Sequence, residues 1–166
     1  MIRPGRATRI LVVAIAATVT ASLASAAEQS KTKTQLSKQA IAAKAAHRLV
    51  LQVNSNEPAV MNLALNNAAN VAQYYQDLGE KVTIEIITFG PGLHMLRNDT
   101  SPVKARIASM ALSTPSISYK ACGNTKENMS KAEDKEVPLI AEASLVKSGV
   151  VRVMELQEQG WTYVKP

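Results

Sequence analysis

From residue 48 onward, the chain alternates short β-type runs with helical patterns, and this alternation limits the folds that it can adopt. Apolar or β-branched runs predict five strands, at 48–53, 82–89, 117–121, 143–146 and 161–164. Helical patterns lie between most of them. Strands that alternate with helices favour a parallel sheet covered by helices on both faces. The sequence therefore predicts one α/β domain over residues 48–166, with a mainly parallel five-stranded sheet.

Proline, glycine and capping residues mark where the predicted helices begin and end. Pro58 falls in the first turn of a helix that Gly79 closes. Asn124 is predicted to cap the helix after the third strand, and Glu127, three residues later, completes a capping-box-like pair. That helix is therefore expected to start at Asn124, whereas Gly160 is expected to end the last helix.

Three loops leave predicted strands on the same side of the expected sheet, at 54–57, 90–97 and 122–125. Helical crossovers keep the strands parallel, so these loops are expected to meet at one edge. Ligands and chemistry in open α/β sheets gather at the carboxyl ends of the strands. We therefore expect the functional site at this edge.

Cys122 is the only cysteine in the chain, so it cannot form an internal disulfide. It is a packed small side chain, a link to another chain, or a reactive thiol. A helix start and basic neighbours lower the pKa of a thiol, and here a predicted helix follows, with Lys120 and Lys126 close in sequence. Gly123 favours an exposed sulfur, because it puts no side chain over the thiol.

The loop at 90–97 offers weaker signals. Gly90-Pro91-Gly92 resembles part of a dinucleotide fingerprint, but Met95 stands where a third glycine is needed. His94 and Arg97 are either a surface turn or groups that bind an anion or transfer a proton. A soft-metal site of His94, Met95 and Cys122 has no close ligand spacing to support it. We therefore expect no cofactor and no metal.

The first 26 residues have the three parts of a secretory signal. Arg3, Arg6 and Arg9 form a positive start, an uncharged apolar run follows at 10–19, and Ala24-Ser25-Ala26 is a small-x-small cleavage pattern. The apolar core is too short for a membrane-spanning helix, which needs about 20 apolar residues. The sequence therefore predicts cleavage near Ala26 and export, to the periplasm if the source is bacterial.

Charge separates the N-terminal segments from the rest of the chain. The net charge of +6 comes from the signal and from residues 27–47, a polar segment rich in Lys and Ala that reads as a solvated leader. From residue 48 on, 12 basic side chains balance 12 acidic ones, and the few aromatic residues are scattered. Because nucleic-acid binding needs a basic face with stacking aromatics, we expect no nucleic-acid partner.

Three segments of the chain resemble the DsrE/DsrF-like family, in its exported single-domain branch. They are 86–93, 119–125 and 148–161, and the Ala-Cys-Gly-Asn-Thr run at 121–125 is the most specific part. The resemblance covers about residues 47–166. It implies a three-layer α/β/α domain that assembles into trimers or hexamers. Better-understood members pass sulfur between proteins as a cysteine persulfide, and the family's cysteine maps onto Cys122.

Sequence and resemblance together give one leading hypothesis and two alternatives. The leading one is an exported sulfur-handling protein in which Cys122 exchanges sulfane sulfur with donor and acceptor proteins. The alternatives are an oligomeric module that binds a small anion at the strand ends, with Cys122 only lining it, and a purely structural assembly protein. The expected ligand-binding residues beside Cys122 are Gly90, Gly92, His94, Arg97, Gly123, Asn124 and Thr125.

Overall fold

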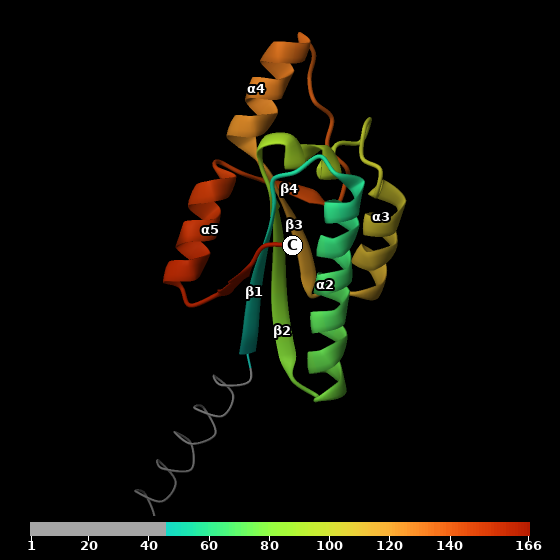
Figure 1. Ribbon diagram of the computed structural model, residues 1–166, viewed down its shortest axis with the longest axis vertical. Helices are drawn as coiled ribbons and strands as arrows, with labels where there is room; N and C mark the ends of the chain where they lie inside the picture. The colour runs from blue at the N-terminus through green and yellow to red at the C-terminus, as the bar shows by residue number, and fades with distance from the viewer. Residues whose placement is uncertain (1–45) are drawn as a thin grey trace, which may run out of the picture. The chain divides into compact units, whose positions relative to one another are not determined.

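The computed structural model describes residues 46–166 of the protein (Figure 1). The predicted signal at 1–26 and all but the last two residues of the predicted leader lie outside the described residues. Among the helices that the structure describes, none is both long and apolar enough to cross a membrane.

Five parallel strands form the sheet, as the alternating pattern predicts. Every neighbouring pair runs parallel, and the strand order is β4-β3-β2-β1-β5. The predicted strand boundaries agree with the observed ones to within two residues. The strands are β1 Ala46–Val53, β2 Lys81–Thr88, β3 Ile117–Cys122, β4 Ala143–Val146 and β5 Thr162–Val164.

Helices cover both faces, so the domain has the three layers expected (Figure 1). Helices α2 (Pro58–Asp77) and α3 (Lys104–Ser113) cover one face of the sheet, and α5 (Gly149–Glu158) covers the other. Helix α4 (Gly123–Glu133) stands beyond the carboxyl ends of the strands. The predicted loop after β2 is instead a 3₁₀-helix, η1 (Gly90–Leu96).

Strand β2 shows how the alternation of side chains builds two cores. Ile84 and Ile86 point into the larger core, under α2 and α3. Ile87 points the other way, into a smaller core with Val153 and Leu156 of α5. Successive side chains of a strand face opposite sides, so one β-branched run supplies both layers. Trp161 and Tyr163, at the C-terminal end of the chain, are partly buried and pack against the smaller core.

Helix α4 begins one residue earlier than the capping signals predict. Strand β3 runs directly into it, Cys122 takes the N-cap position, and no side chain caps the helix. Asn124 therefore lies inside the first turn, where its amide donates to the Lys147 carbonyl at 3.2 Å. Glu127 pairs with Lys131 at 2.6 Å rather than folding back on the helix start. The predicted Asn124–Glu127 capping box is thus wrong.

Candidate functional site

Cys122 lies at the junction of β3 and α4, on the sheet face that α5 covers. Its side chain is only 4% exposed, so the exposed thiol expected from Gly123 is wrong. The space beside Gly123 is filled by backbone: a Cβ there would lie 3.1 Å from the Val146 carbonyl oxygen and 3.4 Å from that of Lys147. The connection from β4 to α5 therefore closes over the site that the glycine was expected to leave open.

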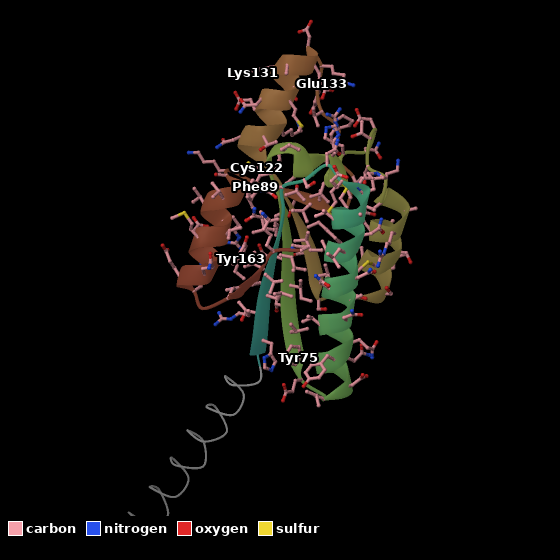
Figure 2. The ribbon with its side chains drawn as sticks, viewed as in Figure 1. Tyr75, Phe89, Cys122, Lys131, Glu133 and Tyr163 are labelled. Atoms are coloured by element: carbon pink, nitrogen blue, oxygen red, sulfur yellow. The ribbon has the colours of Figure 1, made fainter. Side chains whose placement is uncertain are left out.

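Gly149, at the start of α5, packs directly against Cys122. A Cβ on Gly149 would meet Phe89 Cδ1 at 2.8 Å and Cys122 Cβ at 3.2 Å. Phe89 is half-buried at the end of β2, and Figure 2 shows it beside Cys122. No side chain larger than hydrogen fits at position 149 without moving these neighbours. The backbone of α5 therefore comes close to the thiol.

Uncharged donors from two helix starts favour the thiolate of Cys122. Burial by itself raises the pKa of the thiol, but the Thr125 hydroxyl and the amides of Gly149, Thr125 and Asn124 outweigh it and hold the pKa below its usual value. The Asn124 amide already donates a hydrogen bond to the Lys147 carbonyl. The thiolate is therefore stabilised mainly by Thr125 and Gly149. Thiolates are stabilised at helix starts for the same reason.

The lysines near Cys122 in sequence play no such part. Lys126 pairs with Glu136 at 3.1 Å, and Lys120 donates to the Ser144 hydroxyl at 3.0 Å. The groups that lower the pKa of Cys122 are a hydroxyl and backbone amides. The stabilisation is therefore by neutral dipoles rather than by a neighbouring cation.

The 90–97 segment meets the site through Gly90. The Gly90 amide donates to Thr125 Oγ1 at 3.0 Å, which leaves the Thr125 hydroxyl proton free to face the sulfur. Gly90 has φ +53°, a left-handed conformation that glycine adopts at little cost. Gly92 lies two residues further along the chain, and a Cβ there would be 2.1 Å from the Val53 carbonyl oxygen. Gly92 thus closes η1 onto the end of β1 and does not contact the thiol.

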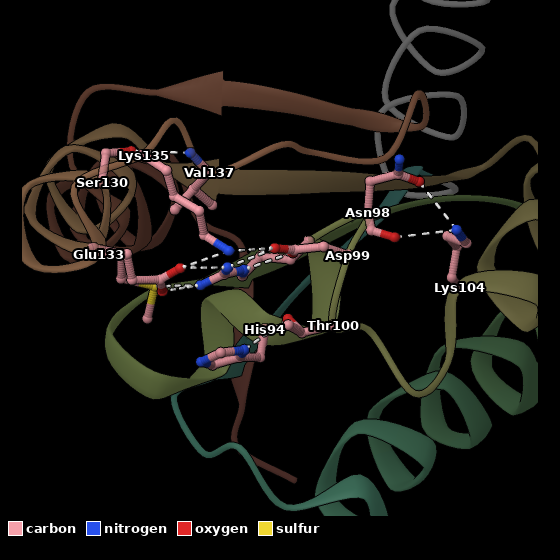
Figure 3. Close-up of polar contacts among 11 residues, drawn as sticks. His94, Asn98, Asp99, Thr100, Lys104, Ser130, Glu133, Lys135 and Val137 are labelled. Atoms are coloured by element: carbon pink, nitrogen blue, oxygen red, sulfur yellow. Dashed lines mark hydrogen bonds and ion pairs between the residues drawn. The ribbon is translucent and has the colours of Figure 1, made fainter.

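The polar contacts of His94 and Arg97 do not include the thiol, and Figure 3 shows the hydrogen bond of His94 to Thr100. His94 Nδ1 and Thr100 Oγ1 share a hydrogen bond at 2.8 Å. The Arg97 guanidinium is 1% exposed and bonds Asp99 at 2.9 and 2.8 Å and Glu133 at 2.8 Å. With two carboxylates bound, Arg97 has no free donor pair for an anion. Both residues were expected in the ligand site, and the structure gives them anchoring contacts instead.

A cleft of about 590 Å³ lies between the start of α4, the β4–α5 connection and one side of α5, and Cys122 is not among the residues that line it. Its lining comes from Asn124, Val146, Lys147, Ser148, Val151, Arg152 and Glu155. A second cleft, of about 360 Å³, lies at the amino end of the sheet near His47, which stacks on Tyr75 at 3.7 Å. That cleft lies at the end of the strands opposite to Cys122, so it is separate from the candidate site at the carboxyl edge.

Metal binding finds no geometric support in residues 46–166, where no three His, Cys, Asp or Glu side chains gather as a ligand set. Met95, one of the three residues considered from sequence, is fully buried in the larger core.

Sequence reasoning missed Phe89, Gly149 and the first turn of α5. A signal for them existed. Residues 147–149 follow β4, a fourth strand whose carboxyl end lies at the same edge as the three loops considered. Counting this fourth connection would have brought Gly149 to the site.

Comparison with known proteins supports the architecture and goes no further. No family model matches the chain, and no curated protein matches it. Among solved structures, it is similar to MTH1491 of Methanobacterium thermoautotrophicum, a protein of unknown function, with a TM-score of 0.60 and 26% sequence identity. The match covers 72% of this chain and 99% of that one. The two proteins thus share a whole α/β domain.

Proposed function

We propose that the protein is an exported member of the DsrE/DsrF-like family that carries sulfane sulfur on Cys122. The observation that supports this most is the environment of the thiol. Cys122 is buried, yet its surroundings favour the charged form, through the Thr125 hydroxyl and the amide of Gly149. A merely packed cysteine needs no such donors, whereas a nucleophilic one does.

The chemistry proposed is thiol exchange without net oxidation. The Cys122 thiolate attacks the outer sulfur of a donor persulfide, R–S–SH. The donor S–S bond breaks, its electron pair leaves with R–S⁻, and Cys122 becomes a persulfide. An acceptor thiolate then attacks the outer sulfur, and the Cys122 thiolate leaves. The same donors stabilise the anion as nucleophile and as leaving group, and a low thiol pKa favours departure.

The exchange needs space for an outer sulfur atom and the group that approaches it, and the nearby cleft is lined by sequence neighbours of the thiol-site residues, although Cys122 itself does not line it. The start of α4 lines it at Asn124, and the start of α5 lines it at Ser148. We propose that donor and acceptor reach the sulfur from this side.

Intact-mass measurement tests the proposal. Reduced protein treated with polysulfide should gain the mass of one or more sulfur atoms, and dithiothreitol or cyanide should remove it. The matched variant Cys122→Ser should gain nothing while keeping its fold. Wild-type protein that gains no sulfur, or loading that survives in Cys122→Ser, would refute a sulfur-carrying role for this thiol.

A second candidate is an anion-binding module in which Cys122 only supports the cleft. The low exposure of the sulfur, 4%, favours it. It predicts that iodoacetamide labels Cys122 only after denaturation, and that Cys122→Ala leaves ligand binding in place. Native labelling would favour the carrier.

Processing and assembly complete the proposal. We propose that cleavage near Ala26 releases the chain to the periplasm or its equivalent, and N-terminal mass analysis of exported protein tests this. We also propose a trimer or hexamer. Apolar side chains exposed on α5 support it: Val150 is 53% exposed and Met154 is 55% exposed, one helical turn apart.

A further inference from the structure

An ion pair between a buried glutamate and a half-buried arginine ties the first turn of α5 to the middle of the sheet. Glu85, on β2, is only 7% exposed. Arg152 binds it with two hydrogen bonds, from Nε to Oε2 at 3.1 Å and from Nη2 to Oε1 at 2.7 Å. A bidentate pair fixes the guanidinium in both position and plane. A carboxylate buried to this extent would be costly without that partner.

Arg152 lies in the same turn of α5 as the residue that packs against Cys122. Gly149 is the first residue of α5, and Arg152 lies within the same turn, where its amide donates to the Ser148 carbonyl at 3.0 Å. The turn has no side-chain cap to hold it. Gly149 packs against Cys122 on one side, and Arg152 reaches Glu85 on the sheet below. The ion pair and the thiol contact therefore hold the same rigid turn at two points.

We propose that Glu85 and Arg152 are positioning residues, whose bidentate pair holds the start of α5 so that the backbone of Gly149 stays packed against Cys122, where a Cβ on Gly149 would lie 3.2 Å from Cys122 Cβ. This inference rests on the role proposed for Cys122, because it gives the Glu85–Arg152 pair a function in stabilising the thiolate in addition to stabilising the fold. Neither side chain takes part in the sulfur exchange.

The signs of two mutant effects separate positioning from direct electrostatics. If Arg152 acted on the thiolate by its charge, Arg152→Gln would raise the thiol pKa, and Glu85→Gln, which removes an anion, would lower it or leave it unchanged. If the pair positions the Gly149 amide, both substitutions free the turn, and both raise the thiol pKa.

Thiolate ultraviolet absorbance of reduced protein, corrected by subtracting Cys122→Ser, gives this pKa without any reagent entering the site. We expect Arg152→Gln and Glu85→Gln each to raise the midpoint by about 0.5 to 1 pH unit, as loss of one donor to an anion does. Arg152→Lys and Glu85→Asp keep the charges but not the bidentate geometry, so each should give about half that shift. These two variants keep the test usable if a neutral variant fails to fold.

Ile107→Val, in the core on the far side of the sheet, is the stability control: it should lower the melting temperature and leave the thiol midpoint unchanged. Opposite shifts in the two Gln variants, or wild-type midpoints in the Lys and Asp variants, would overturn the inference. No sulfur donor is present in this titration. Its failure is therefore distinct from failure of the sulfur-loading test.

Discussion

At the scale of single residues, the thiol and the glycine beside it decide what the site can do. Gly149 admits no Cβ without displacing Phe89 or Cys122, so Gly149→Ala should push the α5 amide away from the sulfur. We expect the thiol pKa to rise by about 0.5 to 1 unit. Crowding should lower the free energy of unfolding by about 1 to 2 kcal/mol. Thiolate absorbance and urea unfolding measure the two effects.

A substitution in the same helix serves as the control for Gly149→Ala. Gln157→Ala changes an exposed position of α5 far from the sulfur and should leave the thiol titration as in the wild type. A wild-type midpoint in Gly149→Ala would mean that its amide does not stabilise the thiolate.

Sequence predicted the place of Cys122 but not its surroundings. The strand-end position follows from local patterns, because β3 and α4 adjoin in the chain. The residues packed around the thiol are Phe89, which directly follows β2 and lies 33 positions before Cys122, and Gly149 of α5, which lies 27 positions after it. The residues around Cys122 in the sequence carry no signal for such contacts, and the signal that existed, the connection after β4 at the same edge, comes from the topology of the sheet. The exposure expected from Gly123 failed for this reason.

At the scale of elements, Arg97 anchors α4 as Arg152 anchors α5. Arg97 extends from the end of η1 and joins Asp99 to Glu133 in the last turn of α4. The Arg97 guanidinium lowers the pKa of Glu133 from 4.5 to about 2 and holds that of Asp99 well below its usual range. Both carboxylates therefore bind protons more readily in the unfolded chain than in the folded one.

The sign of the pH dependence follows from these lowered pKa values. Stability from the Glu133 pair is fully present above about 4.5 and is lost as the pH falls toward about 2. Arg97→Met should lower the melting temperature at pH 7 by several degrees and flatten its fall between those two pH values. Thermal unfolding at a series of pH values measures both. Equal slopes in variant and wild type would show that other carboxylates dominate acid unfolding.

Ion pairs between residues far apart in the chain could not be predicted from the sequence, whereas helix ends could. Gly79 and Gly160 ended their helices as expected, with φ +68° and +81°, because that signal is local. From its sequence context, Arg97 is a candidate for binding an anion. In the fold it binds the carboxylate of Glu133 instead, and because Glu133 lies 36 positions further along the chain, the local sequence does not predict this contact.

At the scale of the whole molecule, the five parallel strands and their helices were predictable, because the hydrophobic pattern and the turn residues indicated the same elements along the chain.

Assembly into a trimer or hexamer is a prediction for the whole molecule. Val150→Lys with Met154→Lys should reduce a trimer or hexamer to smaller species, because two charges would enter an apolar contact. Light scattering at micromolar concentration gives the mass. Leu112→Lys, on α3 and 89% exposed, is the matched control and should keep the wild-type mass. A wild-type chain that is monomeric would refute the assembly.

The uncharged groups around Cys122 have one more consequence. A thiolate paired with an imidazolium is active only in the window between two ionisations, and its partner's charge is weakened by salt. Backbone amides and a hydroxyl neither titrate in the physiological range nor attract counterions. The reactivity of Cys122 should therefore rise once with pH, in a single sigmoid, and its midpoint should be nearly the same in dilute buffer and in concentrated salt. Such a thiol suits a compartment whose acidity and ionic strength follow those of the surroundings.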